Sequence, residues 1–218
     1  MSAKTLGLPD DLQAYVVANG SAPDDLIADL IAETRAALPG RSGMQIAPEQ
    51  AAFLTMITKI QGARHAVEVG TFTGLSSIAI ARGLVPGGRL VCCDVSEEFT
   101  AVARRYWKRA GLDDRIELRL GPAADTLAAM PAEPHIDLAF IDADKGGYAA
   151  YWDAIVPRLV SGGLVLVDNV LWDGQVVDAK PDPSTQTIID FNAAVLADAR
   201  VESMLLPLGD GVTLARKR

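Results

Sequence analysis

The chain has 218 residues, of which 50% are hydrophobic and 22% are charged, and its formal net charge is −8. This length and apolar content suit a folded domain with a substantial core and exclude a largely disordered chain. The acidic balance argues against a protein that binds nucleic acid through a basic face, and the absence of any run of about 18 apolar residues argues against a membrane protein.

The first part of the chain is expected to be helical. Residues 10–38 and 48–61 have the spacing of amphipathic helices, and Pro48 suits the first position of the second one. Residues 38–47 lie between them and contain Pro39, Gly40 and Gly43, so they are predicted to form a loop.

From about residue 63, short β-rich runs alternate with helical stretches. The predicted strands are His65–Val69, Arg89–Asp94, 115–120, 136–142 and 163–168. The predicted helices lie near 75–82, 97–110, Ala123–Ala129 and 148–159. The fourth and fifth strands are almost continuously apolar, which is typical of central strands covered on both faces. Such alternation predicts a doubly wound, parallel α/β sheet.

The C-terminal part departs from this alternation. One more helix is expected after Ser184, followed by a strand at Val201–Leu206, a turn at 209–211 and a strand at 212–215. We interpret this ending as an antiparallel hairpin that joins the sheet edge. The predicted fold is therefore a Rossmann-like, doubly wound, mostly parallel seven-stranded sheet in a single domain, 1–218, with an N-terminal helical cap at 1–62 and a core at 63–218.

A glycine-containing loop, EVGTFTG at residues 68–74, joins the first predicted strand to the next helix. Ligands of open parallel sheets bind beyond the carboxyl ends of the strands, which is where Gly70 and Thr71 are expected to lie. Glycine lets the backbone turn tightly and approach a ligand closely. The loop lacks the G-x-G-x-x-G pattern of dinucleotide-binding proteins, which argues against a nicotinamide cofactor.

Two acids at the ends of predicted strands indicate the kind of ligand. Glu68 would repel a pyrophosphate, but it suits a ligand that carries an ammonium and a sulfonium. Asp94 closes the second strand, where an acid can accept hydrogen bonds from both hydroxyls of a ribose. This pair favours an adenosyl cofactor without phosphates. The alternative is an ordinary strand-to-helix turn with a capping acid.

Three motifs resemble one known family. The runs VEVGTFTGLSS at 67–77, DADK at 142–145 and VDNVLW at 167–172 are similar, in this order, to motifs of the class I S-adenosylmethionine-dependent catechol and caffeoyl-CoA O-methyltransferases. The similarity extends from about Met44 to the C-terminus. The resemblance implies S-adenosylmethionine as the cofactor, a divalent cation, and a small aromatic acceptor with two neighbouring hydroxyls.

The second and third motifs supply oxygen ligands for a metal. Asp142 and Asp168 end strands that we expect to lie side by side, about 4.8 Å apart, and Asn169 adds a carbonyl oxygen. Oxygen ligands without His or Cys select a hard cation, Mg²⁺ first, then Mn²⁺ or Ca²⁺. The alternative is that these acids only cap helices or bind loop amides.

Lys145 is the candidate catalytic base. It lies three residues beyond Asp142, and like charge from a dication and a sulfonium would disfavour its protonated form. The family resemblance assigns it the same role and places Asp142 beside both the cofactor and the acceptor. The expected reaction is a direct displacement without a covalent enzyme intermediate.

Further contacts follow from the resemblance alone. Met44 and Ile46 match a segment that covers the methionine part of the cofactor, Ser76 matches a hydroxyl that holds its carboxylate, and Ala123 matches a contact to the adenine. Asp144 matches a position near the cofactor, although a surface role is the alternative. Trp172 and Asp173 are expected to form a wall of the acceptor cleft. Loop packing is the alternative for Met44, Ile46, Ser76 and Ala123.

Competing functions remain open at this level: a nicotinamide-dependent dehydrogenase, a non-catalytic adenosylmethionine-binding module and an RNA methyltransferase. The acceptor also remains open among a free catechol, a flavonoid, a caffeoyl thioester and a hydroxylated natural-product intermediate. A homodimer is expected from the resemblance. Cys92 and Cys93 are adjacent on a predicted strand, so they point to opposite faces and do not pair; with no signal-peptide pattern, a cytoplasmic location is expected.

Overall fold

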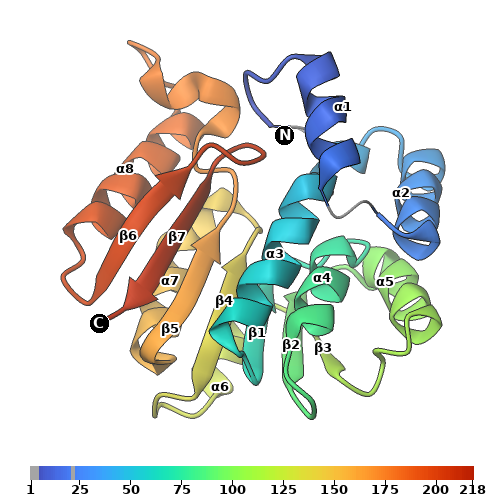
Figure 1. Cartoon of the computed structure of the whole chain (residues 1–218). Coiled ribbons are helices and arrows are strands. Elements are labelled where there is room, and N and C mark those ends of the chain that lie inside the picture. The colour runs from blue at the N-terminus through green and yellow to red at the C-terminus, as the bar shows by residue number, and fades with distance from the viewer. Residues whose placement is uncertain (1–4, 21–22) are drawn as a thin grey trace.

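A computed structural model describes residues 5–20 and 23–218, and over these residues seven strands form one sheet in the order β3-β2-β1-β4-β5-β7-β6 (Figure 1). The strands are β1 His65–Val69, β2 Arg89–Asp94, β3 Ile116–Leu120, β4 Ile136–Ile141, β5 Leu159–Val167, β6 Val201–Leu206 and β7 Val212–Lys217. Strands β1 to β5 are parallel, whereas β7 pairs antiparallel with both β5 and β6. The predicted fold, including the hairpin at the edge, is confirmed.

Helices cover both faces of the sheet (Figure 1). The helices are α1 Asp10–Asn19, α2 Asp25–Ala37, α3 Pro48–Gln61, α4 Leu75–Gly83, α5 Glu97–Arg109, α6 Ala123–Ala129, α7 Tyr148–Ile155 and α8 Pro183–Ala197. Helices α2 to α5 contribute to the core on one face, and α6 to α8 to the core on the other. In the described part of the chain, no helix is both long and apolar enough to cross a membrane.

Strand β4 explains why the middle of the sheet reads as continuously apolar. Leu138 and Phe140 belong to one core, whereas Ala139 and Ile141 belong to the other, and all four side chains are fully buried. Side chains alternate along a strand, so a strand with helices on both faces needs apolar residues at every position.

The N-terminal helical prediction was wrong in one respect. The amphipathic pattern over 10–38 corresponds to two helices, because α1 ends at Asn19 and α2 begins at Asp25. Residues 21–22 lie outside the described part of the chain. The break coincides with Gly20 and Pro23, and the Asp24 carboxylate caps α2 by accepting a hydrogen bond from the Ile27 amide at 3.0 Å.

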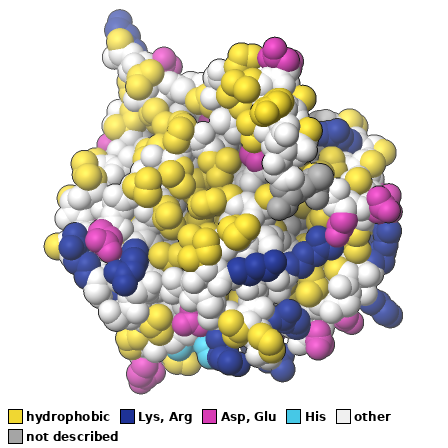
Figure 2. Space-filling model, viewed as in Figure 1, with side chains coloured by type: hydrophobic (Ala, Val, Ile, Leu, Met, Phe, Trp, Pro, Cys, Tyr) yellow, Lys and Arg dark blue, Asp and Glu magenta, His cyan; other side chains and the backbone are white. Residues whose placement is uncertain are grey.

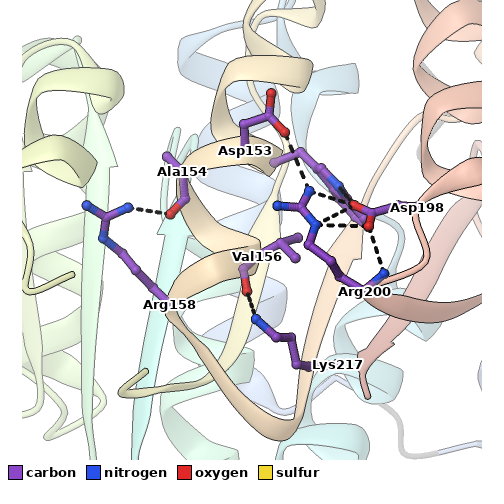
Figure 3. Close-up of polar contacts among 8 residues, drawn as sticks. Asp153, Ala154, Val156, Arg158, Asp198, Arg200 and Lys217 are labelled. Carbon is purple, nitrogen blue, oxygen red and sulfur yellow. Dashed lines mark hydrogen bonds and ion pairs between the residues drawn. The ribbon is translucent and has the colours of Figure 1, made fainter. Parts of the chain in front are cut away.

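The helix predicted over 148–159 is also too long. Helix α7 ends at Ile155, a 3-10 turn follows at Val156–Arg158, and β5 already begins at Leu159. Pro157 has no amide hydrogen to continue the helix. Side chains cap the carbonyls left at this end, since Arg158 donates to the Ala154 carbonyl and Lys217 to the Val156 carbonyl, both at 2.7 Å (Figure 3).

A second polar cluster ties α7 to the segment between α8 and β6 (Figure 3). Arg200 donates to both carboxylate oxygens of Asp198, with Nε–Oδ1 at 2.9 Å and Nη2–Oδ2 at 2.7 Å. The Trp152 indole of α7 donates to the same carboxylate at 2.9 Å, and Asp153 lies 3.6 Å from Arg200. The hydrogen bonds from Arg200, assisted by Trp152, hold the pKa of Asp198 well below its usual range.

The N-terminal segment returns to the C-terminal hairpin. The Leu6 amide donates to the Gly209 carbonyl at 2.8 Å, and the Gly209 amide donates to the Thr5 hydroxyl at 3.2 Å. Thr5 in turn donates to Glu49 of α3 at 2.8 Å, and Gln13 of α1 donates to the same oxygen at 2.6 Å. This network fastens the segment before α1 to both α3 and the β6–β7 turn.

The surface formed by α3 and the β6–β7 hairpin is apolar. Figure 2 shows hydrophobic side chains gathered over the region where α3, β6 and β7 lie in Figure 1. Four side chains of these elements are exposed or only partly buried, and together we call them the apolar face: Phe53 and Ile60 of α3, Met204 of β6 and Leu214 of β7. Met204 is opposite Leu214 in the ladder, Ile60 is 73% exposed and Met204 is 54% exposed.

Candidate active site

A cavity of about 520 Å³ opens at the carboxyl ends of β1, β2 and β4. Nine of the ten residues predicted to contact the cofactor line it: Met44, Ile46, Gly70, Thr71, Ser76, Asp94, Ala123, Asp142 and Asp144. Lys145 lines it as well. These residues come from five separate parts of the chain, and the sheet brings them together because parallel strands end at the same edge.

The loop after β1 requires glycine where it crosses β4. Gly70 has φ +89°, and a Cβ there would lie 1.9 Å from the Asp142 carbonyl oxygen. Beyond it, the Asp94 carboxylate accepts hydrogen bonds from the amides of Thr71 at 2.9 Å and Phe72 at 2.8 Å. Its other oxygen accepts from the Ser96 amide at 2.8 Å. Asp94 therefore shapes the loop in addition to facing the cavity.

Glu68 is the one predicted cofactor residue that does not line the cavity. Its side chain is fully buried, so its contact with the cofactor stays a prediction. Burial raises its pKa to about 7, against the opposing effect of the hydroxyls of Ser76 and Thr71. The Thr71 hydroxyl donates to Oε2 at 2.9 Å, while Oε1 has no partner among the described residues. Glu68 thus lies beneath the loop and supports it.

The segment between α2 and α3 forms one wall of the cavity. Gln45 of this segment is buried, and its Nε2 donates to the hydroxyls of Thr34 in α2 and Thr73 in the β1 loop, both at 3.0 Å. Nearer α2, the Arg41 guanidinium lies over the Phe99 ring of α5, 5.2 Å from its centroid. The first contact fixes Met44 and Ile46 beside the cavity, and the second extends the segment across to α5.

Asp144 is held by a tyrosine of the following helix. The Tyr151 hydroxyl of α7 donates to Asp144 Oδ1 at 2.6 Å, and both residues line the cavity. This hydrogen bond and burial raise the pKa of Tyr151, with burial the larger cause. Tyr151 keeps the Asp144 carboxylate turned toward the cavity.

The predicted metal ligands meet beside the cavity. The strands that precede Asp142 and Asp168 are neighbours, with Ile141 opposite Val167 in the ladder. The Lys145 ammonium is 2.6 Å from Asn169 Oδ1 and 3.4 Å from Asp142 Oδ1. Burial raises the pKa of both carboxyls, Lys145 opposes the rise at Asp142, and the Asp142 charge adds to it at Asp168. Two neighbouring acids whose charges repel each other, Asp168 buried and Asp142 half-buried, form a site that favours added positive charge.

Among the residues that the structure describes, no three His, Cys, Asp or Glu side chains are grouped so that they could hold a metal ion. The candidate set therefore depends on the amide oxygen of Asn169. Oxygen atoms alone select hard cations such as Mg²⁺, Mn²⁺ and Ca²⁺.

Tyr148 fixes the position of Lys145. Its hydroxyl accepts a hydrogen bond from Lys145 Nζ at 2.5 Å and donates to the Asp168 carbonyl at 3.0 Å. The ring is fully buried against Phe191 of α8, with centroids 5.4 Å apart. Burial raises the pKa of Tyr148 well above its usual value, so the hydroxyl keeps its proton and continues to donate to Asp168.

Trp172 and Asp173, the predicted acceptor wall, follow the metal ligands in a 3-10 turn, η4, Trp172–Val177. The Lys145 ammonium lies 5.8 Å from the Trp172 ring centroid, which places this ring beside the candidate base. The Asp173 amide donates to the Asp210 carboxylate at 2.6 Å. Asp210 was not among the predicted site residues, because the β6–β7 turn shows no catalytic motif.

Comparisons with known proteins identify the family and the fold of this chain. The family model described as O-methyltransferase matches residues 18–218. The chain is 36% identical over 208 residues to Probable caffeoyl-CoA O-methyltransferase 2 of Dictyostelium discoideum, covering 93% of this chain and 90% of that one. It is 34% identical to caffeoyl-CoA O-methyltransferase 2 of Petunia hybrida, covering 80% and 76%. Its fold is similar to that of the O-methyltransferase from Bacillus cereus in complex with SAH, with a TM-score of 0.85, 34% identity and coverage of 94% and 96%.

Proposed function

Because this chain belongs to the family of S-adenosylmethionine-dependent O-methyltransferases that includes the caffeoyl-CoA and catechol enzymes, we propose that it methylates one of two neighbouring hydroxyls on a small aromatic acceptor with the help of a divalent cation. Membership of this family sets aside the dehydrogenase and the non-catalytic binding module. The observation that carries the proposal is the convergence of Asp142, Asp168, Asn169 and Lys145 beside the large cavity.

We assign the large cavity to S-adenosylmethionine, which would supply the methyl group. Asp94 would accept hydrogen bonds from the ribose hydroxyls with the lone pairs that its three amide partners leave over. Ser76, in the first turn of α4, would hold the carboxylate at a helix N-terminus. Asp144, oriented by Tyr151, and Ala123, at the start of α6, would border the adenine.

We assign the cation to Asp142, Asp168 and Asn169. The fit rests on chemistry: two carboxyls with raised pKa values and an amide oxygen lie near the position that the Lys145 ammonium occupies. When bound there, Mg²⁺ would polarise the acceptor oxygens and favour loss of the phenolic proton.

We assign Lys145 as the base that takes the acceptor's proton. Tyr148 holds Nζ at the boundary between the cofactor cavity and the metal ligands, with Trp172 beside it. From there Lys145 would accept the hydroxyl proton while the acceptor oxygen forms its bond to the methyl carbon. The carbon–sulfur bond breaks in the same step, and sulfur keeps the electron pair.

The test is methyl transfer to a panel of catechols with Mg²⁺, with excess chelator, and with Mg²⁺ restored. We expect turnover to be lost in chelator and to return with the cation. Asp168→Ala should lose turnover and also calorimetric Mn²⁺ binding, whereas Asp190→Ala, an exposed acid on α8, should lose neither. Full turnover in excess chelator, by the wild type or by Asp168→Ala, would contradict the metal assignment.

We further propose that the chain acts as a homodimer through the apolar face, which offers an exposed hydrophobic surface spanning α3 and the hairpin edge. A reducing, cytoplasmic location is supported by Cys92 and Cys93, which are both free thiols.

A further inference from the structure

The segment that carries the acceptor wall is strained. Three of its residues other than glycine have left-handed backbone angles: Asn169 with φ 57°, Trp172 with φ 49° and Asp173 with φ 51°. Such angles are costly for residues with a Cβ and persist only where the surroundings impose them. Some other part of the molecule must therefore hold residues 169–174 in this shape.

The turn between β6 and β7 makes most of these restraining contacts. The Gly211 carbonyl accepts from the Val170 amide at 3.1 Å, and the Asp210 carbonyl accepts from the Leu171 amide at 3.0 Å. The Asp210 side chain adds the third bond by accepting from the Asp173 amide at 2.6 Å. Three successive parts of the strained segment are thus pinned by two adjacent residues of the turn.

The fit between turn and segment is tight. Gly211 has φ +85°, and a Cβ there would lie 2.4 Å from Leu171 Cγ and 2.8 Å from the Leu171 amide nitrogen. Asp210 is 1% exposed, so its carboxylate is held in place by packing. Its Oδ1 is the one side-chain atom of the turn that bonds a strained amide, and the remaining bonds come from the main chain.

We propose that Asp210 is a positioning residue for the acceptor side of the active site. By holding the Asp173 amide, its carboxylate keeps Trp172 beside Lys145 and maintains the backbone that presents Asn169. This proposal rests on the proposed function, because it assumes that Trp172 borders the acceptor. It does not involve the cofactor cavity, which neither Asp210 nor residues 169–174 line.

The test compares three variants of Asp210. Asp210→Ala removes the acceptor of the Asp173 amide, and Asp210→Glu keeps the charge but moves the carboxylate by one methylene, so both should raise the acceptor KM by about tenfold or more. Asp210→Asn keeps an oxygen at Oδ1 and should restore most of the loss. Cofactor affinity measured by calorimetry should stay within about twofold in all three, which also verifies that they fold.

A spectroscopic readout separates positioning from general stability. The chain has three tryptophans, so 5-fluorotryptophan labelling should give three ¹⁹F resonances, with that of Trp172 identified by Trp172→Phe. We expect the Trp172 resonance to shift or broaden in Asp210→Ala and to recover in Asp210→Asn, while those of Trp107 and Trp152 stay unchanged. The matched control is Asp182→Ala, because Asp182 also accepts from main-chain amides, Ser184 at 2.7 Å and Thr185 at 3.1 Å, but at the start of α8.

The outcomes distinguish the two proposals. If the wild type methylates no catechol, the proposed acceptor class fails, but the fluorine spectra still test Asp210. If the Trp172 resonance and the acceptor KM are unchanged in Asp210→Ala, or if Asp182→Ala alters both to the same extent, the positioning role is overturned.

Discussion

Lys145 illustrates how single side chains define the chemistry of this site. Its Nζ meets Asp142, Tyr148 and Asn169, three oxygen acceptors from two loops and a helix. A flexible lysine held by three partners loses much of its conformational freedom before any acceptor arrives, which favours a fixed line of proton transfer. The same contacts place its charge next to the candidate cation ligands.

If Lys145 is the base, Lys145→Ala should lower kcat by roughly 10²- to 10⁴-fold, the usual contribution of general-base catalysis. The loss should be smaller for a nitro-substituted catechol, because an acceptor that is already ionised needs no base. Steady-state rates with both acceptors across a range of pH measure this difference. Equal losses for the two acceptors would remove the base assignment, and calorimetry should show cofactor affinity nearly unchanged.

Residues at strand ends could be predicted from the sequence, whereas residues that support them could not. Asp94, Asp142 and Asp168 follow apolar runs, and parallel strands deliver such residues to one edge regardless of loop details. Gln45 and Asp210 act through contacts with segments far away in the chain, and no local pattern reports such contacts. The full burial of Glu68 could not be predicted either, because it depends on the side chains that cover its face of β1.

At the scale of elements, boundaries were the weakest part of the prediction. The long amphipathic pattern over 10–38 hid a break, and the helix over 148–159 ran past Pro157 into β5. Hydrophobic periodicity does not show where a helix is capped. Asp24 caps the start of α2 locally, whereas Arg158 and Lys217 cap the carbonyls at the end of α7. Lys217 does so from β7, by donating to the Val156 carbonyl.

Asp198 should make stability depend on pH in a defined direction. Its folded-state pKa lies below the unfolded value, so its contribution is fully present above about pH 4 and is lost as pH falls through the lower, folded-state pKa. At pH 7, Asp198→Asn should lower the free energy of unfolding by about 1–3 kcal/mol, as expected for a charged hydrogen-bond acceptor. Urea unfolding of both proteins from pH 7 to pH 3 measures the difference between their free energies of unfolding.

The difference in unfolding free energy between the wild type and Asp198→Asn should be constant above about pH 5 and should become smaller below about pH 4. Asp153→Asn is the matched control, because Asp153 approaches the same Arg200 but is largely exposed. It should change stability by less than about 1 kcal/mol. A free-energy difference that grows as the pH falls would show that Asp198 is not the source of this pH dependence.

At the scale of the whole molecule, the apolar face is notable because packing within the chain leaves it exposed to solvent. Both faces of the central strands are covered, yet Met204 and Ile60 remain exposed where α3 approaches the hairpin. The sequence predicted the hairpin but not this face, because it depends on how α3 lies relative to β6 and β7. Hydrophobic patches of this kind are typical of protein–protein contacts.

Light scattering after size exclusion should therefore give twice the 23.0 kDa mass of the chain. A Met204→Glu and Ile60→Glu double variant should shift the population toward the monomer, because burying two charges in an apolar interface is costly. Leu196→Glu is the control, since Leu196 is 82% exposed at the end of α8, away from the apolar face. A monomeric wild type would contradict the dimer.

The contact between Thr5 and Gly209 has a consequence for the protein's synthesis. The two residues are 204 positions apart, and a ribosome adds about 5–20 residues per second. Gly209 is therefore synthesised roughly 10–40 s after Thr5. Most of the parallel sheet and the cofactor loop can form during this interval. The β6–β7 turn does not yet exist, so it cannot form its hydrogen bonds to residues 169–174. We expect the nascent chain to bind adenosylmethionine before it can seat an acceptor.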